Sequence, residues 1–157
     1  MHSPAGTPLA IARAALLVGT LDASAAVLNY LATGGKAPVR IFLYIASAAL
    51  GKEALTGGWS MAALGLLFHY LIAATWTVFF FLIYPHVRVL AKNAAATGLA
   101  CGLFVWTVMN LAVVPLSHIG RFPSDPSKAA VQAAILVVCI GLPLSFLARR
   151  HYAAPRN

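Results

Sequence analysis

Four long apolar segments divide this chain of 157 residues. They cover residues 9–31, 59–84, 94–114 and 129–148. A helix rising about 1.5 Å per residue needs about 20 apolar residues to cross a hydrocarbon core of about 30 Å. Lipid offers no hydrogen-bond partners to the backbone, so a spanning segment of this kind has to be a helix. The sequence therefore predicts a single all-α integral membrane domain, a polytopic four-helix bundle.

Composition supports a membrane protein. Hydrophobic residues make up 61% of the chain and charged residues 9%, whereas soluble domains have about 45–50% and about 25%. The formal net charge is +8, and the basic residues lie at the ends of apolar segments, where they set topology and meet anionic headgroups. No basic cluster is interleaved with aromatic residues. We therefore expect the lipid bilayer, and not nucleic acid, as the partner of these charges.

A shorter apolar run follows the first segment. Residues 39–50 lie between Pro38, which suits a first helical turn, and Gly51, which suits a helix end. This length is typical of a short re-entrant or interfacial helix. The alternative, a fifth crossing that puts the termini on opposite sides, stays open at this point.

The basic residues also predict an orientation. With four spans, the two termini and the 85–93 connection share one side of the membrane. That side carries the pairs Arg88/Lys92 and Arg149/Arg150. By the positive-inside rule, we expect both termini in the cytoplasm.

Asp22 lies near the middle of the first span. An Asp at the centre of a spanning helix costs about 2.5 to 3.5 kcal/mol to insert, so it must face protein or water. Counting along the helices puts His69 of the second span at the same depth, close enough to form a hydrogen bond or an ion pair with Asp22. Three more polar residues, Asn29, Asn110 and Gln132, lie about 10 Å further toward the outside. We expect all five to line one intramembrane pocket.

Two interpretations of these polar residues stay open. In the first, a water-accessible pocket binds or passes a proton or a small polar solute. In the second, the side chains form hydrogen bonds that hold the helices together, and each bond contributes on average about 0.6 kcal/mol. The protein would then be a structural or accessory subunit that associates with another membrane protein. A homodimer would reconcile the small size with transport.

Small residues indicate where helices approach each other. Gly19 and Gly65 belong to stripes of small and polar residues on the first two spans. Gly98 and Gly102 form a G-x-x-x-G pattern in the third span, which favours a contact within the bundle over a dimer seam. The fourth span is expected to bend near Pro143, because proline removes a backbone donor.

Enzyme and metal motifs are missing from the sequence. It holds no H-E-x-x-H, G-x-S-x-G or phosphate-binding loop. Cys101 and Cys139 have no metal-ligand spacing and are expected to be free thiols. A bis-histidine haem needs a second His at the depth of His69, and the sequence offers none. We therefore expect no catalytic residue, no metal and no cofactor.

Four segments resemble a group of small, uncharacterised four-span proteins of the bacterial inner membrane. They are GTLDASAA (19–26), GLLFHYLIA (65–73), MNLAVVPLS (109–117) and IGLPLS (140–145), and the resemblance covers most of residues 10–150. It implies four helices with a short segment after the first, and a bacterial inner-membrane location, but no activity. Proteins of this group are expected to have a His near the start of the fourth span, where this chain has Gln132.

Overall fold

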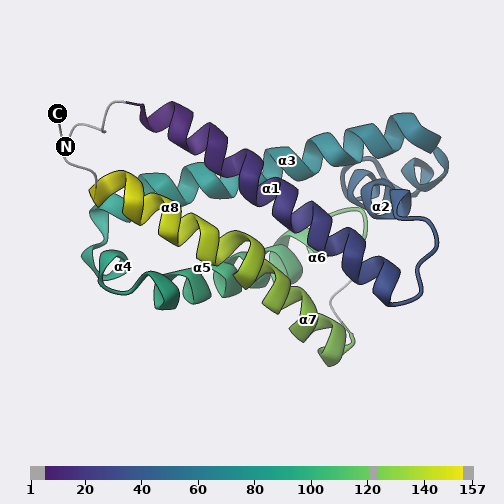
Figure 1. Cartoon of the computed structure of the whole chain (residues 1–157). Helices are drawn as coiled ribbons and strands as arrows, with labels where there is room; N and C mark the ends of the chain where they lie inside the picture. The colour runs from purple at the N-terminus through teal and green to yellow at the C-terminus, as the bar shows by residue number, and fades with distance from the viewer. Residues whose placement is uncertain (1–5, 121–123, 154–157) are drawn as a thin grey trace.

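The computed structural model describes residues 6–120 and 124–153, and the elements in this part of the chain are all helical (Figure 1). Four helical segments of these residues are long and apolar enough to cross a membrane. They are built from α1 (Thr7–Ala32), α3 (Gly58–Ile83), α5 (Ala94–Val108), and α7 (Pro126–Leu136) with α8 (Leu142–Ala153). The chain is therefore an all-α, multi-pass membrane protein, as its sequence predicts.

Short irregular segments extend or join these helices. A 3-10 turn, η2 (Tyr84–His86), continues α3. A π-helical turn, η3 (Met109–Val113), leads from α5 into α6 (Val114–Leu116). A second π-helical turn, η4 (Val137–Gly141), joins α7 to α8 and forms the interruption expected near Pro143.

Side-chain caps explain where two of the spans begin. The Oδ1 atom of Asn93 accepts hydrogen bonds from the backbone N–H groups of Ala95 and Ala96, at 3.0 and 3.1 Å, so α5 begins at Ala94. Asp125 caps α7 in the same way. The fourth span therefore starts at Pro126, a few residues before the predicted position.

The spans are arranged so that α1 packs against α3 on one side and against the fourth span on the other, and α5 packs against the fourth span. The start of α1, the end of α8 and α4 (Arg88–Lys92) lie at one end of the bundle, and α2 (Val39–Leu50) and α6 lie toward the other (Figure 1). A hydrogen bond of 3.1 Å between Thr7 and His151 joins the start of α1 to the end of α8. This places both ends of the described chain on the same side.

The tightly packed core lies in the half of the bundle that contains the termini. Val18, Phe81 and Leu144 are among its most buried side chains. The hydroxyl of Tyr152 donates to the carbonyl oxygen of Phe81 at 2.8 Å, and its ring stacks on that of Tyr84. The opposite half is less tightly filled and contains the pocket described below.

The G-x-x-x-G pattern of the third span is used within the chain. The backbone of Gly141 in η4 fits against Gly98 and Gly102. A Cβ atom on Gly98 would lie only 2.7 Å from the Cα atom of Leu142. These glycines therefore permit the close approach of α5 and the fourth span.

The other two glycines predicted at helix contacts have different neighbours. Gly19 on α1 lies against α3, where a Cβ atom would be 2.8 Å from the ring of Tyr70 and 3.3 Å from the Cβ atom of Ala73. Gly65 on α3 lies against the backbone carbonyl of Phe42 in α2, and not against the first span. The stripe of small residues on α3 therefore serves two different helices.

The short helix α2 has the bounds that the sequence predicts. It follows Pro38 and ends at Gly51, whose φ of 87° is a conformation that favours glycine. Its 12 residues reach about 18 Å, too short for a fifth crossing. It runs across α3 (Figure 1), and the backbone N–H of His118 donates to the carbonyl oxygen of Ala48 at 3.1 Å. A 3-10 segment, η1 (Lys52–Thr56), then leads to α3.

Candidate functional site

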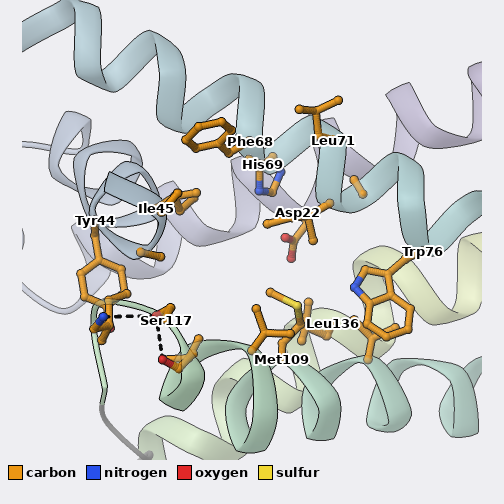
Figure 2. A pocket seen from close by; sticks show the side chains of 18 of the residues that line it. Asp22, Tyr44, Ile45, Phe68, His69, Leu71, Trp76, Met109, Ser117 and Leu136 are labelled. Carbon is orange, nitrogen blue, oxygen red and sulfur yellow. Dashed lines mark hydrogen bonds between the residues drawn. The ribbon is translucent and has the colours of Figure 1, made fainter. Parts of the chain in front are cut away.

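A pocket of about 420 Å³ lies between the spans, with walls from α1, α2, α3, α5 to α6, and α7 to η4 (Figure 2). Its lining is mostly apolar. The ionisable side chains among the residues that line it are Asp22, His69 and Tyr44, and Ser117 is a further polar one. Among these lining residues there is no Lys or Arg.

Asp22 projects from α1 into this pocket. Figure 2 shows its carboxyl group in the space between α3 above and the helix that carries Met109 below. Within residues 6–120 and 124–153, this carboxyl group has no hydrogen bond and no ion pair. The basic side chain that shares the pocket lining with it is His69. A partly buried carboxyl group inside a span, with no bonded partner in these residues, makes Asp22 a candidate functional residue.

His69 is held by a backbone carbonyl group. Its Nε2 atom lies 2.8 Å from the carbonyl oxygen of Gly19. A carbonyl oxygen can only accept, so Nε2 must carry the proton and donate it. In the neutral ring, Nδ1 is then left as an acceptor.

The direct Asp22–His69 bond that we expected is not formed. Gly19 lies one turn before Asp22 on the same face of α1. Because Gly19 has no side chain, α3 approaches closely at this point and His69 reaches the backbone of α1. Asp22 and His69 therefore share the pocket without bonding to each other.

The other three predicted residues do not line this pocket. Asn110 lies in η3, and its Nδ2 donates to the carbonyl oxygen of Trp106, one turn earlier, at 3.1 Å. Asn29 lies near the end of α1, and Gln132 on α7 is exposed. Depth along the helices, which the sequence gives, is not enough to bring these side chains together.

The part of the pocket away from the termini has a wall that sequence reasoning missed. Its residues come from α2 and from the turn after α6, and they include Tyr44, Ala48 and Ser117. Periodicity gives no information on where a short helix docks. The apolar length of residues 39–50 and the two flanking breakers were the only signal.

The two π-helical turns also shape the pocket. Each ends two residues before a proline, η3 before Pro115 and η4 before Pro143. A proline ring crowds the carbonyl group four residues earlier, and a wider turn relieves this contact. Met109 of η3 and Ile140 of η4 both line the pocket. The two prolines were therefore the sequence signal for this part of the site.

The pocket is open between α3 and α5. Backbone contact between these two helices is slight, and they meet through aromatic rings, with Trp76 and Phe104 at 5.8 Å between ring centroids. Leu71 on α3 and Val113 on η3 line the pocket while 54% and 42% of their surfaces are exposed. Because both residues belong to membrane spans, this opening faces the hydrocarbon region of a bilayer.

Comparisons of this chain with protein-family models, curated proteins and solved structures find no match. The resemblance to small bacterial inner-membrane proteins therefore stays a prediction. A functional conclusion has to rest on the geometry of the pocket.

Proposed function

We propose that this membrane protein binds a small molecule in the pocket and exchanges a proton at Asp22. The observation that carries the proposal is the carboxyl group of Asp22, which lines the pocket and has no hydrogen-bond partner in the described part of the chain. A purely structural Asp would be expected to bond to a neighbouring helix, since only such a bond offsets its insertion cost. The mostly apolar lining means that the polar part of the ligand is small.

The location in our proposal is the bacterial inner membrane, with both termini in the cytoplasm. The proximity of Thr7 and His151 supports an even number of crossings, and the pairs Arg88/Lys92 and Arg149/Arg150 at that end support a cytoplasmic side. In this orientation the outer wall of the pocket, formed by α2 and Ser117, lies toward the outside.

A homodimer or a partner membrane protein stays a prediction. Gly98 and Gly102 offer no support for it, because both are packed against the fourth span of the same chain.

Thiol labelling tests whether the pocket receives small molecules. In a chain with Cys101 and Cys139 replaced by Ser, Ala48→Cys would place a thiol at the pocket wall, and Ala46→Cys would place one on the same helix at a fully buried position outside the lining. A small uncharged reagent such as methyl methanethiosulfonate, which can reach the pocket from water or from lipid, should modify Ala48→Cys many times faster than Ala46→Cys. Equal, slow reaction at both positions would contradict a pocket that small molecules enter.

A further inference from the structure

The pocket combines one carboxyl group with an apolar and aromatic lining. Phe68 and Trp76 of α3 and Tyr44 of α2 contribute aromatic rings. Cations are attracted to the faces of such rings, and the attraction increases when water is excluded. No Lys or Arg among the described lining residues supplies a positive charge. The lining therefore offers a cation one carboxyl group and several aromatic faces.

Access to the pocket points to a ligand that dissolves in the bilayer. Three large lining residues are exposed, and two of them, Leu71 on α3 and Val113 on η3, are apolar. The third, Tyr44 on α2, adds an aromatic ring with a hydroxyl group. A strongly hydrated ion would have to lose its water to pass between them. A molecule with a large apolar body would already be present at this depth.

We propose that the pocket takes up an amphiphilic cation from the bilayer, with Asp22 as its counter-charge. The inference rests on the proposed function and names the class of ligand. When Asp22 is ionised, no Lys or Arg of the lining balances its charge, and a bound cation would neutralise it. An amphiphilic anion would instead meet the carboxyl group as a like charge.

Cation binding is coupled to a proton in this arrangement. The titratable groups near Asp22 are His69 on α3, Tyr44 on α2 and Cys139 on η4. Asp22 and His69 line the same pocket without a bond to each other. A cation beside the carboxyl group of Asp22 favours its ionised form over its protonated form. Binding should therefore release protons.

A pair of ions with similar shape and opposite charge tests the proposal. Tetraphenylphosphonium and tetraphenylborate would be titrated against the whole protein in lipid nanodiscs, with empty nanodiscs as the blank. Wild-type protein should bind the phosphonium saturably and release protons into a weak buffer. Asp22→Asn should weaken the affinity at least about tenfold. Asp125→Asn changes the other Asp of the chain, which lies outside the spans, and should leave the affinity unchanged.

The outcomes that overturn the proposal are distinct. Equal phosphonium affinity in wild type and Asp22→Asn would mean that apolar contacts alone bind the ion. Saturable binding of the borate would mean the same. If Asp22→Asn does not fold, the pH dependence of the wild type decides: a phosphonium affinity that does not fall as the pH is lowered contradicts the proposal, because a protonated carboxyl group is no counter-charge. Labelling of Ala48→Cys together with no phosphonium binding would refute this ligand class and leave the proposed pocket intact.

Discussion

His69 and Asp22 differ at the residue scale in how the fold holds them. His69 donates to the carbonyl oxygen of Gly19, so its position depends on a contact between the backbone of α1 and a side chain of α3. Asp22 has no such bond in the described residues and is positioned only by the helix that carries it. The imidazole is therefore a structural link beside the pocket, and the carboxyl group is free to meet a ligand.

Replacing His69 tests that link. His69→Phe keeps an aromatic ring and removes the donor, so the carbonyl oxygen of Gly19 loses its side-chain partner. We expect a loss of stability of about 1 kcal/mol, within the range measured for hydrogen bonds between membrane helices. Unfolding in mixed micelles would measure it. His86→Phe, at an exposed position in η2, is the control and should have little effect; equal losses would argue against the link.

At the scale of helices, the shape of the pocket follows from which pairs approach closely. Glycines bring α5 against the fourth span and α1 against α3. Aromatic side chains, by contrast, keep α3 and α5 apart, as the contact between Trp76 and Phe104 illustrates. Glycines therefore bring two pairs of spans together, and the pocket is open where aromatic rings hold α3 and α5 apart.

Gly102→Ile tests the tight pair. A side chain there would collide with the backbone of Val137 in η4, so we expect a loss of about 1–3 kcal/mol or failure to assemble the bundle. Ala100→Ile on the same helix adds a side chain at an exposed position and should be tolerated. Thermal unfolding of the two variants in detergent would compare them. If Gly102→Ile left stability unchanged and altered only the oligomeric state, the glycine would belong to a dimer seam.

The sequence carries much of this element-level description. Apolar length predicts the four spans, and Pro38 with Gly51 predicts α2 with its observed bounds. Counting along the helices predicts one depth for Asp22 and His69, and both residues line one pocket. Which faces meet is a different matter, because it depends on packing between helices. For this reason periodicity could not show that Gln132 lies apart from Asp22. Nor could it show that α2 forms a wall of the pocket.

At the scale of the whole molecule, the bundle is compact at the end that contains the termini and open toward the other. The core around Val18, Phe81 and Leu144 supplies stability in the first half. The second half holds the pocket, bounded by the two π-helical turns and by α2. This division lets the pocket stay incompletely filled without loss of the fold.

The carboxyl group of Asp125 offers an internal reference for measurements on Asp22. It accepts hydrogen bonds from the side chain of Ser127 and the backbone of Lys128, which lower its pKa from 3.8 to about 2. Its stabilising contribution is therefore present above about pH 4 and is lost as the pH falls through about 2. Asp125 should therefore stay ionised at neutral pH.

The most direct test of the proposed role of Asp22 is carboxyl ¹³C NMR of aspartate-labelled protein in nanodiscs. The chain has two Asp residues, so two signals are expected, and Asp125→Asn assigns them. We predict that the Asp22 signal moves when tetraphenylphosphonium is added at constant pH and that the Asp125 signal does not. If the chemical shift of Asp22 changed neither with the cation nor with the bulk pH, the proposed role would be contradicted, and Asp22 would be an inert residue of the bundle.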